Sequence, residues 1–371
     1  MTPFRWILAF CLTLLAGGCM MNAELVANTD NMKHPNAARY EDGKFHNSAK
    51  IETAGIGKTV GIFWRFMTAS KVDAEPEVNL PVKEITREQL DQLADDRFWL
   101  IKLGHSSILL KVYGDYWLID PVFAERASPF SFMGPKRFHQ PPIELKELPP
   151  IKKVLISHNH YDHLDKESIA HLAELSESFY VPLGVDGDLK KWGVAEEKIK
   201  SFDWWQEERA GDQLIAFTPT QHFSGRGMSD GNSTLWGSWV IKTANESLYF
   251  SGDSGYFAGF KQIGETYGPF DLTLIETGAY DKDWANIHMT PEESVQAHLD
   301  LQGKVMIPIH NGTFDLAFHA WYDPLNRVTE AAEAHQVSLS TPVVGDILQV
   351  TSPAVEQRWW QGLQNTQLAT L

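Results

Sequence analysis

One loop of nine residues constrains this chain more than any other stretch: Ser157-His158-Asn159-His160-Tyr161-Asp162-His163-Leu164-Asp165. It follows the apolar run 154–156, which is typical of a short buried strand. His158 and His160 lie two positions apart, so an extended backbone directs both side chains to the same side. Asp162 and His163 follow where the chain must turn. Four such donors in one turn suit a borderline metal such as zinc better than they suit an ordinary polar loop.

Further candidate ligands come later in the chain, each just past a predicted strand. His222 follows the apolar run 214–217, Asp253 follows 248–250 and His310 follows 305–309. The end of a strand is rigid and fixes the position of its side chains, so it is a suitable place for a metal ligand. Taken singly, each of these residues is more often a satisfied polar residue than a ligand. Together with the histidine-rich loop, they indicate a larger metal site.

These motifs, an H-x-H-x-D-H loop, a later His, an Asp after Gly and a final His, resemble the metallo-β-lactamase superfamily. More of the chain, from about Phe45 to Ser340, is similar to the N-acyl-phosphatidylethanolamine-hydrolysing phospholipase D family. The segments that carry this similarity are 118–123, 126–129, 134–138, 156–165, 288–293 and 309–314. The resemblance implies an α/β fold, the αββα sandwich, in which two facing mixed sheets are flanked by helices.

The resemblance also implies which residues hold metal. One metal would be held by His158, His160 and His222, the second by Asp162, His163 and His310, and Asp253 would bridge both. The expected cofactor is two Zn²⁺, although iron and manganese also suit these ligands. A bound metal lowers the pKa of water to about 7, and a pair of metals suits phosphate diesters as well as carbonyl substrates.

Other residues are candidates for catalysis or for support of the ligands. His288, before the helix predicted from Pro291, matches a histidine of the family's active site, and we expect it to act with Asp162 in catalysis and to contact the substrate; a surface histidine is the alternative. Tyr161 is a candidate substrate contact, with loop hydrogen bonding as the default. His105 and Asp120 are either supports for metal ligands or turn residues.

The N-terminal region predicts export and attachment to a membrane. Residues 1–18 carry a basic residue and an apolar stretch too short to span a bilayer comfortably, as in a signal peptide. The segment 15–19 resembles a bacterial lipobox, which implies lipidation of Cys19 and an outer-membrane anchor facing the periplasm of a bacterial envelope. An ordinary cleaved signal and an uncleaved anchor are the alternatives.

The remaining organisation follows from composition. Residues 19–44 are polar and predict a flexible tether, 45–350 a hydrolase domain, and 351–371 a tail that either packs back or stays loose. The apolar, aromatic segment 60–67 predicts either an element that touches lipid or a helix packed on the domain. The two cysteines of the chain are Cys11 and Cys19, so the domain has no catalytic thiol and no disulfide framework.

The formal charge of −16, from 32 basic and 48 acidic residues, disfavours nucleic acid as a partner. We therefore expect a lipid-anchored metallo-phosphodiesterase. Like the family that it resembles, it would hydrolyse N-acylphosphatidylethanolamine or a related phospholipid to phosphatidic acid and N-acylethanolamine. The alternatives are a periplasmic lactonase or β-lactamase-type hydrolase and a non-catalytic envelope protein that binds zinc. A homodimer is the default oligomer.

Overall fold

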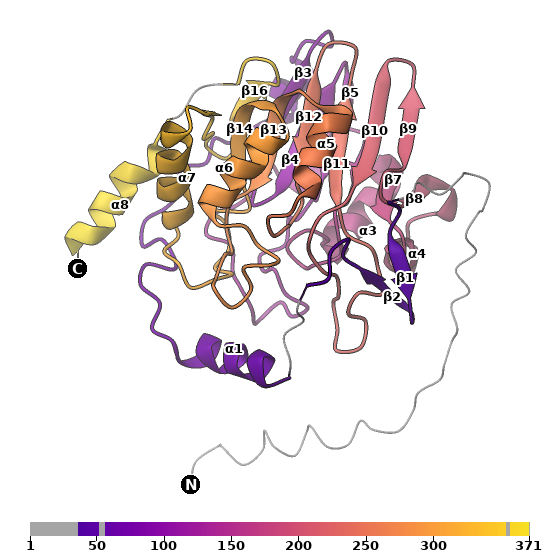
Figure 1. Ribbon diagram of the computed structural model, residues 1–371. Helices are drawn as coiled ribbons and strands as arrows, with labels where there is room; N and C mark the ends of the chain where they lie inside the picture. Colours follow the sequence, from indigo (N-terminus) through magenta and orange to yellow (C-terminus); the bar gives the residue numbers. More distant parts are fainter. Residues whose placement is uncertain (1–35, 52–55, 354–356, 371) are drawn as a thin grey trace. The chain divides into compact units, whose positions relative to one another are not determined.

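The computed structural model describes residues 36–51, 56–353 and 357–370. The predicted signal peptide and Cys19 lie outside the described residues. Within them, no helix is long and apolar enough to cross a membrane. What is described contains two large sheets, a small hairpin and the helices that cover the sheets (Figure 1).

The first sheet precedes and follows the histidine-rich loop in the sequence. Its strands are β3 (Phe98–Gly104), β4 (Ser107–Val112), β5 (Asp115–Ile119), β6 (Ile151–Leu155), β7 (Ser176–Pro182), β8 (Ile199–Phe202) and β16 (Ile347–Gln349). They are ordered β16-β3-β4-β5-β6-β7-β8. The pairs from β5 to β8 are parallel and the others are antiparallel, so the sheet is mixed.

The second sheet carries the later candidate ligands. Its strands are β9 (Glu207–Ala210), β10 (Gln213–Thr218), β11 (Ser238–Lys242), β12 (Ser247–Phe250), β13 (Phe270–Glu276), β14 (Gly303–Ile309) and β15 (Ser338–Leu339). They are ordered β15-β14-β13-β12-β11-β10-β9, with parallel pairs from β12 to β15. This sheet is also mixed.

Alternating side chains explain how each strand is buried on both faces. In β4, Ile108 and Leu110 belong to the core that joins the two sheets, whereas Leu109 belongs to a second core with Ile169 and Leu172. Because successive side chains of a strand point to opposite faces, a strand between a sheet and a helix layer needs apolar residues at every position. The unbroken apolar runs of the sequence therefore correspond to central strands.

Helices cover the outer faces of both sheets. They are α2 (Arg87–Asp91), α3 (Lys166–Leu175), α4 (Asp186–Lys191), α5 (Gly259–Tyr267), α6 (Pro291–Asp300) and α7 (Asp323–Ala334), with short 3-10 helices at Leu145–Glu147 and Glu196–Lys198. Contacts of α3 with β7 and of α6 with β13 and β14 place helices on each sheet, and α5 and α6 lie in front of the second sheet in Figure 1. The αββα sandwich is thus confirmed.

The folded part of the chain begins earlier than the sequence indicated. The strands β1 (Arg39–Glu41) and β2 (Lys44–His46) form a hairpin that begins inside the range 19–44 expected to be a tether and ends just beyond it. The backbone N–H of Ala38 donates to Asp203, and that of Phe45 donates to the carbonyl of Asn232. The Phe45 side chain is 2% exposed in the core. The described fold therefore includes residues from Ala38 onward, a few positions before the expected end of the tether, because their partners lie far along the chain.

Two further helices lie outside the sandwich. The first is α1 (Ile56–Thr68), which contains the segment 60–67 for which the sequence left two alternatives. The second is α8 (Trp359–Thr370), in the C-terminal tail. Trp360 of α8 is fully buried with Leu80, Trp321 and Leu325, so the tail packs back on the domain.

Candidate metal centre

The candidate ligands lie at one edge of the two sheets, where several strands end. His158 and His160 follow β6, His222 follows β10, Asp253 follows β12, and His310 follows β14 directly. The backbone before Asp253 is tightly constrained: Gly252 has φ +56°, and a Cβ there would meet the carbonyl oxygen of Gly237 at 2.7 Å. Only glycine fits this turn, which explains the Gly-Asp sequence at the site.

A first group of four residues could hold one metal ion: His158, His160, His222 and Asp253. The ligand atoms of this group all lie within 4.8 Å of one another. Nδ1 of His160 lies 2.9 Å from Nε2 of His158 and 3.2 Å from Nε2 of His222. Two ligands on one zinc ion, each about 2.0–2.1 Å from it, are separated by distances of this order.

The hydrogen bonds around this group determine which nitrogens are free. Nδ1 of His222 donates to the carbonyl of Ile287 at 2.9 Å, so its Nε2 carries a lone pair. The hydroxyl of Ser157 donates to Asp120, so it accepts from Nδ1 of His158 at 2.9 Å, and Nε2 of His158 also carries a lone pair. Two lone pairs thus converge on the same nitrogen of His160, an arrangement that a cation stabilises and hydrogen bonds alone do not.

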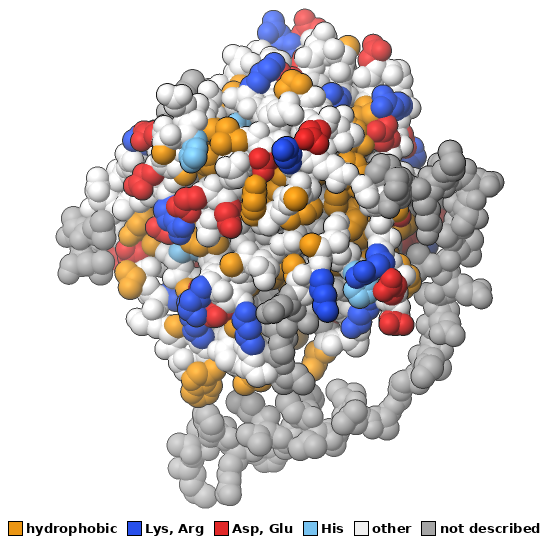
Figure 2. Space-filling model, viewed as in Figure 1, with side chains coloured by type: hydrophobic (Ala, Val, Ile, Leu, Met, Phe, Trp, Pro, Cys, Tyr) orange, Lys and Arg blue, Asp and Glu red, His pale blue; other side chains and the backbone are white. Residues whose placement is uncertain are grey.

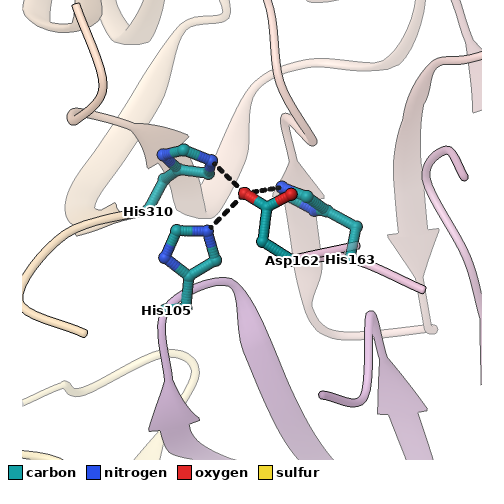
Figure 3. Close-up of side chains that lie close together, drawn as sticks. All are labelled: His105, Asp162, His163 and His310. Carbon is teal, nitrogen blue, oxygen red and sulfur yellow. Dashed lines mark hydrogen bonds and ion pairs between the residues drawn. The ribbon is translucent and has the colours of Figure 1, made fainter. Parts of the chain in front are cut away.

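A second group contains His105, Asp162, His163 and His310, again with ligand atoms within 4.8 Å of one another (Figure 3). Oδ2 of Asp162 lies 3.0 Å from Nε2 of His105 and 3.2 Å from Nε2 of His310, and 3.6 Å from Nε2 of His163. Figure 3 shows the three imidazoles around this carboxylate. Asp162 and the histidines come from three separate loops, so only the fold brings them together.

Asp253 lies between the two groups. Its Oδ1 is 3.1 Å from Nε2 of His163, and its Oδ2 is 3.2 Å from Nε2 of His310 and 3.7 Å from Nε2 of His158. Nδ1 of His163 donates to Asp120, so Nε2 of His163 and Oδ1 of Asp253 face each other without a hydrogen bond. Two buried acceptors at this distance repel unless a cation or a proton lies between them. The donor set therefore fits a metal ion.

The charge state of the histidines differs between the two groups. Burial lowers the pKa of His160 to about 4 and holds the pKa of His158 well below its ordinary value, so both are neutral ligands. Burial also lowers the pKa of His310, but Asp253 and Asp162 outweigh it and raise that pKa to about 10 in the metal-free chain. A proton thus takes the place of a cation there, and metal binding would release it.

The sequence left two roles open for Asp120 and His105, the support of a metal ligand or a position in a turn. In the structure each of these residues has both roles. Asp120 follows β5 with φ 42° and accepts hydrogen bonds from Nδ1 of His163 at 2.7 Å and from the backbone N–H of Ser157 at 2.7 Å. His105 sits in the β3–β4 turn with φ 52°, and its Nε2 contacts Asp162. Asp120 fixes the orientation of His163, and His105 adds a fourth donor to the second group.

The expected substrate contact of Tyr161 does not match its position. Its hydroxyl donates to the carbonyl of Arg226 at 2.8 Å, and the guanidinium of Arg226 lies 3.9 Å from the centre of its ring. Tyr161 is not among the residues that line the cavity over the metal groups. The default interpretation, that it holds the loop, fits this geometry.

His288 lines that cavity and is held by a residue that sequence reasoning missed. Its Nδ1 is hydrogen-bonded to Oε1 of Glu276, and Oε2 of Glu276 accepts from the backbone N–H of Ser254. Glu276 is fully buried at the end of β13, and with His288 and His310 it forms a third group that could bind a cation. The signal in the sequence was Glu276 itself, an acidic residue at the end of a mostly apolar strand.

A second contact absent from the sequence analysis fixes His222. The side chain of Asn47 accepts from the backbone N–H of His222 at 3.0 Å and donates to its carbonyl at 2.8 Å. Its oxygen is also 3.3 Å from Nε1 of Trp236. The segment after β2 is therefore fastened directly to a candidate metal ligand.

The metal groups form the floor of a cavity of about 940 Å³. His160, Asp162, His222, Asp253 and His310 line it, with apolar contributions that include Ile62, Phe223 and Leu316. Its size is that of a drug-sized or lipid-headgroup ligand site rather than of a single ion. The site is thus open to a substrate.

Comparison with known proteins indicates the same class of protein as the fold and the candidate metal ligands do. The beta-lactamase superfamily domain matches residues 116–311, more than half of the chain. A metallo hydrolase of Ignicoccus hospitalis shares the fold, with a TM-score of 0.52, 22% identity, and coverage of 68% of this chain and 97% of that chain. The chain belongs to the metallo-β-lactamase superfamily, and the class that its fold and donor set define is a metal-dependent hydrolase.

Three relatives place it more closely within the superfamily. An uncharacterized protein of Mycobacterium tuberculosis is 40% identical over 330 residues, 87% of each chain. An N-acyl-phosphatidylethanolamine-hydrolyzing phospholipase D of Caenorhabditis elegans is 34% identical over 270 residues, 69% of this chain and 75% of its own. The outer membrane protein RomA of Klebsiella pneumoniae is 48% identical over 104 residues, 28% of this chain and 78% of its own. The resemblance to the phospholipase family is thus supported over most of the described domain.

Proposed function

We propose that this chain is a phosphodiesterase that uses two metal ions, expected to be zinc, to hydrolyse N-acylphosphatidylethanolamine or a related phospholipid. The products would be phosphatidic acid and N-acylethanolamine. The observation that carries the proposal is the pair of ligand groups joined by Asp253 on the floor of a cavity large enough for a headgroup. The similarity to the Caenorhabditis elegans relative, which is named for the hydrolysis of N-acylphosphatidylethanolamine, supports the choice of substrate.

The ligand groups fix where the reaction would occur. His158, His160 and His222 would hold one ion, Asp162, His163 and His310 the other, and Asp253 would contact both. When bound, two divalent ions lower the pKa of water at the site and supply positive charge to the phosphate oxygens. The protein contributes a rigid floor, because Asp120 and Asn47 hold the orientation of His163 and the backbone of His222.

His288 is placed to contact the part of the substrate that does not contact the metal ions. Glu276 engages its Nδ1, which leaves Nε2 as the nitrogen available to a molecule in the cavity. Burial lowers the pKa of His288, but Glu276 outweighs burial and raises it above its ordinary value, so the protonated ring would donate a hydrogen bond from Nε2 to a phosphate oxygen or to the departing ethanolamine oxygen. A protein hydrogen bond that strengthens as charge develops lowers the barrier of the chemical step.

The proposed setting is the bacterial envelope. An anchor at Cys19 would hold the domain at the periplasmic side of the outer membrane, next to a phospholipid substrate. The relative named as an outer membrane protein supports this placement.

The test is a product analysis on vesicles. Full-length protein loaded with zinc is incubated with bacterial phospholipids that contain N-acylphosphatidylethanolamine, and products are identified by mass spectrometry. We expect phosphatidic acid and N-acylethanolamine in equal amounts, and their loss in Asp253→Asn. Free fatty acid or lysophospholipid instead would mean that a carbonyl is attacked. No lipid product from protein that carries two metals would overturn the proposal and favour lactone or β-lactam substrates.

A further inference from the structure

The helix α1 presents two different faces. Ile62 lines the cavity, and Arg65 on the same side is fastened to the domain: its guanidinium pairs with Asp281 at 2.7 Å and Asp283 at 2.6 Å and lies 3.9 Å from the centre of the Phe318 ring. The other side points to solvent. There Val60 is 60% exposed and Trp64 is 68% exposed, one helical turn apart. Because Arg65 fixes the helix, this apolar pair is held outward.

Cationic side chains gather around the same cavity. Five line it, all of them exposed: Arg39, Lys44, Lys50, Lys58 and Lys282. Among the described residues, Lys44, Lys50 and Lys58 form no ion pair, although the chain as a whole carries a formal charge of −16. Figure 2 shows Lys and Arg side chains over the part of the face where Figure 1 has α1 and the β1–β2 hairpin, and further ones over the upper part of the same face. The buried ligands form the floor, so these cations form the rim.

We propose that this rim is a docking surface for an anionic phospholipid bilayer. The docking surface consists of three lysines of this rim, Lys44, Lys50 and Lys58, and of the exposed pair Val60 and Trp64 on the solvent side of α1. Tryptophan is favoured at the boundary between headgroups and acyl chains, and lysines beside it attract anionic headgroups.

The charges favour a bilayer over a protein partner. A bilayer presents many anionic groups at once, which matches three unpaired lysines spread over two segments of the chain. The acidic residues elsewhere are screened, because the Debye length at physiological salt is about 8 Å. The cavity would then open toward the membrane. Docking is independent of the proposed hydrolysis, because the rim can bind a bilayer whether or not the site cleaves its lipids.

The test measures the position of Trp64 relative to lipid. Full-length protein is mixed with vesicles of phosphatidylethanolamine and phosphatidylglycerol whose acyl chains carry bromine, which quenches tryptophan fluorescence on contact. We expect quenching that is lost in Trp64→Phe, and amide exchange in residues 57–68 that slows on the same vesicles. An anchor at Cys19 attaches the protein but does not by itself protect this helix.

Matched variants separate the rim from general surface effects. Lys44→Glu, Lys50→Glu and Lys58→Glu together should abolish quenching, and Val60→Ser should reduce it. Lys261→Glu on α5 and Leu299→Ser on α6, both exposed residues outside the rim, should leave it unchanged. Equal quenching by neutral phosphatidylcholine vesicles would show that the lysines do not contribute to binding and would contradict the choice of an anionic bilayer. Absence of both quenching and protection on anionic vesicles would overturn the proposal and leave a protein as the partner of this face.

Discussion

Oδ2 of Asp120 accepts a hydrogen bond of 2.7 Å from Nδ1 of His163, and both side chains are fully buried. Asp120 is not a candidate ligand itself. It fixes the tautomer of His163, so that Nε2 faces Asp253 within the second group of candidate ligands. Through Ser157 it also determines the tautomer of His158. One carboxylate therefore orients a histidine in each of the two ligand groups.

Replacement of Asp120 should weaken metal binding without removing a ligand. We expect Asp120→Asn to lower the affinity for zinc about 10–100-fold, since partners of this kind have effects of that order. Competition with a chromophoric chelator measures the affinity directly. The control is Asp115→Asn, at the exposed first residue of β5, the strand that precedes Asp120. This variant should bind zinc normally. Unchanged affinity in Asp120→Asn would show that His163 is oriented by packing alone.

Asn47 is the second orienting residue, and its loss should affect both stability and metal retention. Asn47→Ala removes two hydrogen bonds to the backbone of His222, which we expect to cost about 1–3 kcal/mol in the free energy of unfolding. Zinc should also dissociate faster. Urea unfolding and the rate of zinc transfer to a chelator measure the two effects. The neighbouring exposed Ser48→Ala should change neither, and equal rates in the two variants would contradict the role assigned to Asn47.

The contact between Glu276 and His288 should matter for turnover. Glu276→Gln keeps the size of the side chain but removes the charge beside His288, and we expect the maximal rate on the lipid substrate to fall about 10–100-fold. The zinc content should stay near that of the wild type, which separates this effect from loss of metal. Glu265→Gln, an exposed residue on α5, serves as the control. A fall in zinc content that matches the fall in rate would instead make Glu276 a metal ligand.

His298, away from the metal groups, should make the stability depend on pH. It is buried on α6, where Nδ1 lies 2.7 Å from the hydroxyl of Thr273, and burial lowers its pKa to about 4 from an ordinary value of 6.5. The unfolded chain therefore binds a proton that the native chain does not. This contribution to stability is complete above pH 6.5 and is lost as the pH falls toward 4.

The size of the effect follows from that shift. Between pH 7.5 and pH 5 the wild type should lose about 2 kcal/mol more than His298→Gln in the free energy of unfolding. Urea unfolding at the two pH values measures this difference, and a comparison at equal zinc concentration cancels the effect of metal loss. Parallel pH profiles for the two proteins would assign the acid sensitivity to other groups.

Several features of this protein could be predicted from the sequence because their signals are local. The H-x-H-x-D-H loop after an apolar run places ligands at a strand end, and the later His222, Asp253 and His310 repeat that pattern. Thr290 before Pro291 is a helix-capping signal that can be read in the sequence, and the structure has a capping box there. In contrast, the sequence indicates a helix over 327–335, whereas α7 begins earlier, at Asp323, with Pro324 in its first turn.

The rest was decided by tertiary structure, because it depends on pairs of residues far apart in the chain. Asn47 and His222 are 175 positions apart, and Asp120 and His163 are 43 apart. No periodicity or spacing reports such a contact, since it forms only when packing of the two sheets brings separate strand ends to one edge. The same packing decides which side of α1 faces the domain. The sequence by itself thus determined which side chains can bind metal, and the fold decided what orients them.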